Sequence, residues 1–93
     1  MHRQPISHIR DVPEQKALGR AVKYKRALRG LSQEELGFMS GLHRNYVGAI
    51  ERGEINPTFA TLLRVSRGLR LSLPELMTTY VEVEAERRTV QHR

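Results

Sequence analysis

The sequence has no cysteine, so neither a disulfide framework nor a thiolate metal site is available to it. No apolar run approaches the roughly 20 residues that a membrane span requires, so we expect no membrane association. The first residues, MHRQPISHIRD, have no apolar segment typical of a secretory signal, and we expect a cytoplasmic protein. Strand signals are scarce, because no segment alternates cleanly between apolar and polar residues. What remains is a chain of 93 residues, enough for one small domain.

Positive charge is what the chain has in excess, with a formal net charge of +6. Residues 1–31 carry the whole excess, since they hold eight Lys and Arg residues against Asp11 and Glu14. Residues 32–93 hold eight basic and eight acidic residues and are neutral as a whole. This balance indicates a polyanionic partner, with nucleic acid as the first candidate. Charge alone leaves open a solvated surface with a basic tail.

Helix signals recur five times along the chain. Capping boxes, in which a polar N-cap residue is followed three residues later by Glu, predict helix starts at 11–14, 32–35 and 72–75. A helix from His43 to Glu51 and a helix capped by Thr58 complete the set. Glycines mark the predicted helix ends: the first helix ends at Gly30, Gly41 is a left-handed cap, Gly53 closes the third helix, and Gly68 lies near the end of the fourth.

Apolar residues at helical spacing predict which faces are buried. For the first helix these are Leu18, Ala21, Val22 and Leu28. For the fourth they are Phe59, Leu62, Leu63 and Val65, and for the fifth Leu73, Leu76, Met77, Tyr80 and Val81. The sequence therefore predicts an all-α fold, a compact five-helix bundle spanning residues 11–86. Residues 1–10 and 87–93 are polar and charged, and we expect them to be mobile tails.

Residues 32–51 carry the most specific pattern in the chain. Two short predicted helices meet at Gly41, and their inward apolar residues are Leu36, Leu42, Val47 and Ile50. This arrangement predicts a helix-turn-helix, in which the first helix crosses the DNA backbone and the second places its N-terminal side chains in the major groove. The outer face of the second helix, where residues are able to face bases, is predicted to hold Arg44, Asn45, Gly48 and Ala49.

Residues 18–77 resemble the Cro/C1-type helix-turn-helix family, the xenobiotic-response-element-like regulators. The resemblance lies in LSQEELG at residues 31–37, GLHRNYVGAIERG at 41–53 and NPT at 56–58, followed by Leu62, Leu69 and Leu76. It implies a lambda-repressor-like DNA-binding domain. Within the family, short chains without an effector domain resemble phage-type repressors and restriction–modification controllers, and residues 42–51 look especially like the controllers.

Three residues depart from the family pattern. Gly37 stands where Ala is usual, and this change is expected to loosen the first motif helix by about 1 kcal/mol. Phe38 and Met39 stand where charged or polar residues are usual. For this pair two interpretations stay open, namely local packing and a partner surface.

The outer face of the second motif helix and the family resemblance together imply a set of DNA-contacting residues: Gln33, His43, Arg44, Asn45, Tyr46, Ala49, Arg52 and Asn56. Arg44 and Asn45 match base-reading positions, where Arg is able to donate two hydrogen bonds to guanine and Asn to pair with adenine. The resemblance implies phosphate contacts for Gln33, Arg52 and the backbone around Asn56. Tyr46 is predicted either to reach a phosphate or to pack its ring on the helix surface. Arg26 and Glu51 match a buried salt bridge of the family.

These observations predict a sequence-specific transcriptional regulator that binds a partly palindromic double-stranded DNA operator as a homodimer through the fifth helix. The alternative is an antitoxin or another protein-interaction module that binds DNA secondarily. We expect no enzyme and no cofactor, because no nucleophile–base pair or phosphate loop is present. We expect no metal site either, because the four histidines are scattered.

Overall fold

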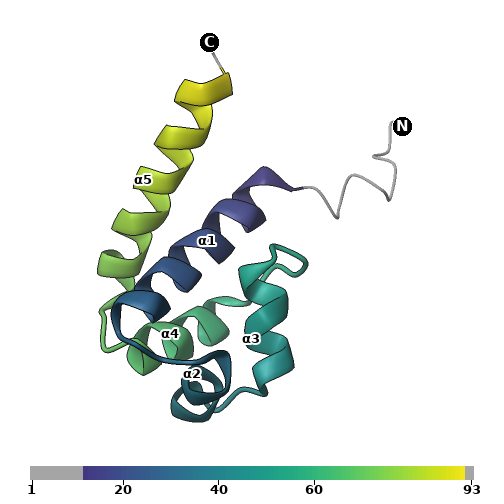
Figure 1. The fold of residues 1–93 in the computed structure, drawn as a ribbon, viewed down its shortest axis with the longest axis vertical. Helices are drawn as coiled ribbons and strands as arrows, with labels where there is room; N and C mark the ends of the chain where they lie inside the picture. Colours follow the sequence, from purple (N-terminus) through teal and green to yellow (C-terminus); the bar gives the residue numbers. More distant parts are fainter. Residues whose placement is uncertain (1–11, 92–93) are drawn as a thin grey trace.

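The computed structural model describes residues 12–91, and this part of the chain is all helical and contains no strand. Five helices follow one another with short connections, namely α1 (Pro13–Leu28), α2 (Gln33–Ser40), α3 (Arg44–Glu51), α4 (Phe59–Gly68) and α5 (Leu73–Gln91). In Figure 1, α2, α3 and α4 gather at one end of α1, while α5 lies beside α1 and projects away from the other helices. The predicted all-α, five-helix architecture is confirmed.

The helix starts follow from local hydrogen bonds. At Ser32, Oγ accepts from the backbone N–H of Glu35 (2.9 Å), and the Glu35 carboxylate accepts from the backbone N–H of Ser32 (2.7 Å). Ser72 and Glu75 exchange the same two bonds, at 3.3 and 2.7 Å. Thr58 Oγ1 caps α4 by accepting from the backbone N–H of Thr61 (3.1 Å). Both capping boxes and the Thr58 cap are therefore confirmed, and each satisfies N–H groups that a helix leaves without a partner.

The capping box predicted at 11–14 is wrong. The N-cap of α1 is Val12, which has no side-chain capping bond, and Pro13 is the first helical residue. Glu14 therefore occupies the second helical position rather than the third, from which a carboxylate reaches back to the N-cap. The helix begins here because proline needs no hydrogen-bond partner for its nitrogen and has its φ preset. Residues 1–10, predicted as a tail, lie outside the described residues.

The C-terminal boundary also differs from the prediction. Helix α5 continues to Gln91, whereas the sequence interpretation ended the domain at 86 and assigned 87–93 to a tail. No glycine or proline stops the helix after Pro74, and an ion pair one turn apart supports it, with Arg87 Nε 2.6 Å from Glu84 Oε1. This hydrogen bond lowers the pKa of Glu84. The predicted boundary therefore falls inside a helix.

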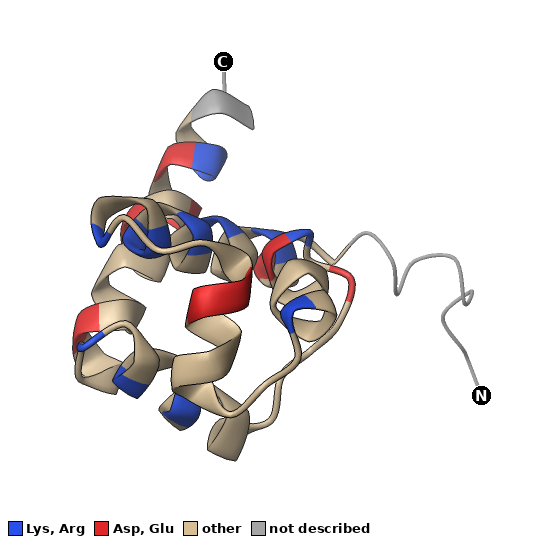
Figure 2. Ribbon diagram, turned by 60° about the horizontal axis from the view of Figure 1, so that its bottom comes forward, with Lys and Arg blue, Asp and Glu red and all other residues tan. Residues whose placement is uncertain are grey.

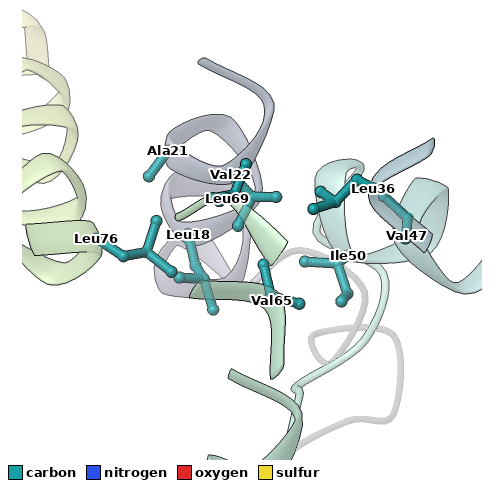
Figure 3. Packing of buried hydrophobic residues seen from close by; sticks show 9 residues of the cluster. All are labelled: Leu18, Ala21, Val22, Leu36, Val47, Ile50, Val65, Leu69 and Leu76. Carbon is teal, nitrogen blue, oxygen red and sulfur yellow. The ribbon is translucent and has the colours of Figure 1, made fainter. Parts of the chain in front are cut away.

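The core is one cluster to which all five helices or their ends contribute: Leu18, Ala21, Val22, Leu36, Val47, Ile50, Val65, Leu69 and Leu76. Figure 3 shows it as a row with Leu76 at one end and Val47 at the other. Three predicted core residues are instead exposed, namely Leu28 (62%), Phe59 (66%) and Val81 (59%). They share helix faces with buried residues but lie where no neighbouring helix covers them.

Two glycines allow backbones to approach closely around α3. A Cβ built on Gly19 of α1 would lie 2.3 Å from the carbonyl oxygen of Ile50, so α1 rests against the last turn of α3. A Cβ built on Gly37 would lie 2.5 Å from the carbonyl oxygen of Leu42 in the turn between α2 and α3. Gly37 therefore has a second role that the sequence did not show, because the tight turn has no room for a side chain at this position.

Candidate nucleic-acid interface

Helices α2 and α3 are joined by a tight turn centred on Gly41. This glycine has φ 72° and ψ 32°, a left-handed conformation that residues with a Cβ rarely adopt. The turn is closed by a hydrogen bond from the backbone N–H of Leu42 to the carbonyl of Gly37 (2.8 Å). The geometry is that of a helix-turn-helix, with α3 in the place of the recognition helix.

The N-terminus of α3 is capped by His43. Its Nδ1 accepts a hydrogen bond from the backbone N–H of Asn45 (3.0 Å), and its side chain is exposed. Because Nδ1 is the acceptor, the neutral ring carries its proton on Nε2, on the side away from the helix. The residue at this predicted DNA contact therefore also fixes where the recognition helix begins.

A buried ion pair holds the other end of α3. Arg26 of α1 donates from Nε to Glu51 Oε2 (2.6 Å) and from Nη2 to Oε1 (3.0 Å), and its Nη1 donates to the carbonyl of Leu31 (2.7 Å). The two side chains are only 15% and 3% exposed. The hydrogen bond with Glu51 raises the pKa of Arg26, so this guanidinium stays charged. The predicted Arg26–Glu51 salt bridge is confirmed as a structural element of the domain.

Gln33, the first residue of α2, joins this pair. Its Nε2 donates to Glu51 Oε1 (2.9 Å), and the side chain is half-buried. Glu51 therefore accepts hydrogen bonds from two different helices, which fixes α2, α1 and α3 relative to one another. The amide of Gln33 is held in one orientation next to α3, at the edge of the surface that the sequence assigns to DNA.

The outward face of α3 lacks one of the four positions that periodicity assigns to it. Arg44 and Asn45 are exposed, and Ala49 is half-buried. Gly48 was placed on this face by helical periodicity, but it is buried, because Gln33 leans over it from α2. Arg44 Nη1 lies 3.9 Å from Glu34 Oε1, and since both side chains are mostly exposed, this pair holds Arg44 only weakly. Arg44 and Asn45 are thus the two polar side chains at the N-terminal end of α3 that are available to a ligand.

Tyr46 and Asn56 lie apart from that pair. The ring of Tyr46 is half-buried and packs against the core cluster, as one of the two interpretations predicted. Asn56 is exposed in the turn before α4, and it lines a hollow together with Leu18 of α1 and Tyr80 of α5. The structure therefore brings together Gln33, the N-terminal end of α3 and Arg52, whereas Asn56 borders a different hollow.

Arg52, predicted to contact phosphate, has a partner within the protein that the sequence analysis missed. Its Nε and Nη2 donate to the Glu54 carboxylate at 2.8 and 3.1 Å. This bond raises the pKa of Arg52 and lowers that of Glu54. The sequence does contain a signal for this ion pair, because Arg52 and Glu54 carry opposite charges on either side of Gly53. Gly53 has φ 74° and turns the chain back.

Basic residues recur along α1, as Figure 2 shows. Between its ends, α1 carries five Lys and Arg residues and one acidic residue, Glu14. Within the described part of the chain, no three His, Cys, Asp or Glu side chains are grouped so that they could hold a metal ion. Over the same residues, no helix has the length and apolar character needed to cross a membrane.

Comparison with known proteins places this geometry in a family. The chain belongs to the helix-turn-helix family, because the profile described as Helix-turn-helix matches residues 22–76, more than half of the chain. It is a DNA-binding regulator of the Cro/C1 type, as predicted, and the family is not a known family of enzymes.

Several of the similar proteins are control proteins of restriction–modification systems or carry that description. Control protein C.SmaI of Serratia marcescens is 44% identical over 61 residues, which cover 66% of this chain and 73% of the relative. The crystal structure of the restriction–modification controller C.AhdI from Aeromonas hydrophila aligns with a TM-score of 0.69 at 37% identity, covering 70% of this chain and 98% of that one. The controller C.Esp1396I, solved as a tetramer with its natural 35-base-pair operator, aligns with a TM-score of 0.72 at 27% identity, covering 75% and 92%.

Proposed function

We propose that the protein is a transcriptional regulator of the restriction–modification controller type. In this proposal it acts in the cytoplasm, as a homodimer on a partly palindromic operator, with α3 in the major groove. The observation that carries the proposal is the exposed Arg44–Asn45 pair at the N-terminal end of α3, on a helix held from behind by Arg26, Glu51 and Gln33. The names of the relatives, and the operator complex of one of them, support the same conclusion.

Each predicted contact has a chemical role in this proposal. Arg44 donates to guanine O6 and N7, and Asn45 pairs with adenine N6 and N7. Ala49, one turn further along α3, contributes an apolar contact of the kind that thymine methyl groups accept. The phosphate backbone is contacted by Gln33, His43, Arg52 and the backbone N–H groups around Asn56, which fixes the position of the protein on the duplex.

Replacing the base-reading arginine tests this proposal. We expect Arg44→Ala to weaken binding to the selected operator by about 1–3 kcal/mol and to relax preference for one base pair, while the far-ultraviolet spectrum stays unchanged. Arg67→Ala, which removes an exposed arginine of α4, is the matched control and should leave sequence preference intact. The operator is obtained by selection from a random DNA pool. An equal loss on operator and random DNA would show that Arg44 does not read a base.

The homodimer is proposed to form through α5 and the end of α4. Val81 on α5 is 59% exposed, and Met77 and Tyr80 on the same helix are only half-buried, so α5 presents apolar surface. A single helix-turn-helix reads only a few base pairs, and a two-fold dimer places two recognition helices about 34 Å apart on one face of the duplex. A dimer that binds both half-sites of the operator has a higher affinity than one chain bound to a single half-site.

Mass measurement tests the dimer. Sedimentation at micromolar concentration should give twice the mass of one chain, and Val81→Glu should give a single chain with an unchanged helix content, because Val81 is exposed in the monomer. Wild-type protein that sediments as one chain at this concentration would contradict the homodimer.

A second candidate function is a protein-interaction module, and one surface favours it. Phe38 is 88% exposed and Met39 43% exposed on α2, and both line a hollow with Leu31, Glu34 and Glu35. Large exposed apolar side chains of this kind are frequent at protein interfaces. Expression with the neighbouring genes distinguishes the two functions: an antitoxin co-purifies with a second chain, and Phe38→Ser abolishes this association without changing DNA binding.

A further inference from the structure

The cap of α3 differs in chemistry from the other side-chain caps of the domain. Helices α2, α4 and α5 are capped by the hydroxyl groups of Ser32, Thr58 and Ser72, which are neutral throughout the physiological pH range. Helix α3 is capped by the imidazole of His43, whose Nδ1 accepts from the backbone N–H of Asn45 at 3.0 Å. Histidine is the side chain whose charge ordinarily changes between about pH 5 and 8. Among the described helices, α3 is therefore the one whose cap a proton is able to remove in this range.

A protonated imidazole is unable to serve as this cap. Both nitrogens of the charged ring are N–H donors, so two donors would face each other where His43 Nδ1 now accepts from Asn45 at 3.0 Å. The first turn of a helix also carries the positive end of the helix dipole, where a cation is unfavourable. The ring must then turn away from α3, and the Asn45 N–H loses the partner that it has in the neutral protein.

The charged groups around this turn supply no acceptor that would hold a protonated ring in the place of the cap. On α3, Arg44 follows His43 directly and is itself a cation, while Glu51 lies at the opposite end of the helix. On α2, Glu34 lies 3.9 Å from Arg44 Nη1, and Glu35 belongs to the capping box at the start of that helix. Helix α1 also packs on α3, but against its last turn.

We propose that His43 is a positioning residue for operator readout, and that this readout requires its imidazole to be neutral. The inference rests on the proposed function, because Arg44 and Asn45, the side chains assigned to bases, form the first turn that this cap holds. Bidentate contacts to base edges depend on side-chain geometry, so fraying of that turn weakens them. Attraction to phosphates is independent of sequence, and a charged imidazole adds to it. Protonation of His43 therefore lowers the preference for the operator over random DNA.

The test measures the ratio of affinities for the selected operator and for a duplex of random sequence, at constant salt. For wild type we expect this ratio to fall roughly fivefold for each bound chain between about pH 8 and about pH 5.5, the size of the loss of one helix cap. Fluorescence anisotropy of labelled duplexes gives both affinities. Circular dichroism verifies that the domain stays folded at both pH values.

Two substitutions are the matched controls. Serine caps a helix throughout this pH range, so the ratio of His43→Ser should equal that of wild type at about pH 8 and should not fall at lower pH. Its affinity for both duplexes should be lower, because it lacks the ring. His43→Ala has no cap, so its ratio should be low at both pH values. All three proteins contain His2, His8 and His92, so a pH dependence caused by these residues appears in all three alike.

Nitrogen NMR of the free protein checks the cap without DNA. At about pH 8 the ring proton of His43 should lie on Nε2, and the amide resonance of Asn45 should shift as the ring gains its second proton. A ring proton on Nδ1, a wild-type ratio that does not change with pH, or an equal fall in His43→Ser would overturn the role of His43 and leave the proposed function intact. Wild-type protein that prefers no duplex sequence at about pH 8 would overturn both.

Discussion

Removal of Arg26 provides the sharpest test of how the recognition helix is held. In Arg26→Met, the Glu51 carboxylate, whose side chain is 3% exposed, keeps only the Gln33 amide as a hydrogen-bond donor. Leaving one charge of a buried pair without its partner costs about 3–5 kcal/mol. We expect the lower end, about 3 kcal/mol, because the Arg26 side chain is 15% exposed and water enters where it stood. For a chain of this length the total stability is roughly 5–14 kcal/mol.

Urea denaturation followed by circular dichroism measures this loss. The urea concentration at which half of the protein is unfolded should be lower for Arg26→Met than for wild type. The slope of the unfolding free energy against urea concentration should stay the same, since the surface exposed on unfolding hardly changes. The control is Arg26→Met combined with Glu51→Leu, which should recover most of the stability, because an apolar pair needs no ionic partner.

Two results would refute this reasoning. A loss below about 1 kcal/mol is the size found for exposed ion pairs, and it would show that water already solvates Glu51 in the wild type. A double variant as unstable as Arg26→Met would show that the guanidinium acts mainly through its bond to the Leu31 carbonyl rather than through Glu51.

Further predictions concern single side chains around the same surface. Glu54→Gln should bind duplex DNA more tightly at low salt, because it removes a negative charge beside Arg52, and weaker binding in a fluorescence titration would contradict this. Glu75→Ala should lower the melting temperature at neutral pH. Hydrogen bonds from Ser72 lower the pKa of Glu75 below its usual 4.5, so its contribution is present above that value and is lost as the pH falls through the lowered pKa. The melting temperatures of wild type and variant should therefore converge as the pH falls below that range, and a constant difference would contradict the assignment. Gly37→Ala should destabilise the domain by about 1–3 kcal/mol despite the better helix propensity of alanine, because its methyl group meets the Leu42 carbonyl; a higher melting temperature would contradict this.

The parts of the fold that were predictable are those that local chemistry decides. Ser32 and Ser72 each carry their Glu partner three residues later, so the capping box forms whatever the rest of the chain does. Gly41 and Gly53 adopt positive φ at the predicted helix ends for the same reason. The Arg26–Glu51 pair was found only through resemblance to a family, since no spacing rule connects residues 25 positions apart.

The errors concern contacts between elements. Helical periodicity placed Gly48 on the outer face of α3, because the sequence does not show that Gln33 leans over it from α2. It also placed Leu28 and Val81 in the core, although each lies beyond the reach of a covering helix. Helix α5 was predicted to end too early because the charged residues 87–93 looked like a tail, whereas the Glu84–Arg87 pair supports another turn of helix.

Gly19 has a consequence for genetic work on this protein. It lies on α1, buried against the carbonyl groups of Ile50 and Glu51, and it contacts no residue of the predicted reading face. Any substitution pushes the end of α3 outward, which shifts Arg44 and Asn45 relative to a bound duplex. A screen for loss of operator binding would therefore return changes at residue 19 as readily as changes at residue 44. The two classes separate when stability is measured alongside binding, since only the first lowers the melting temperature.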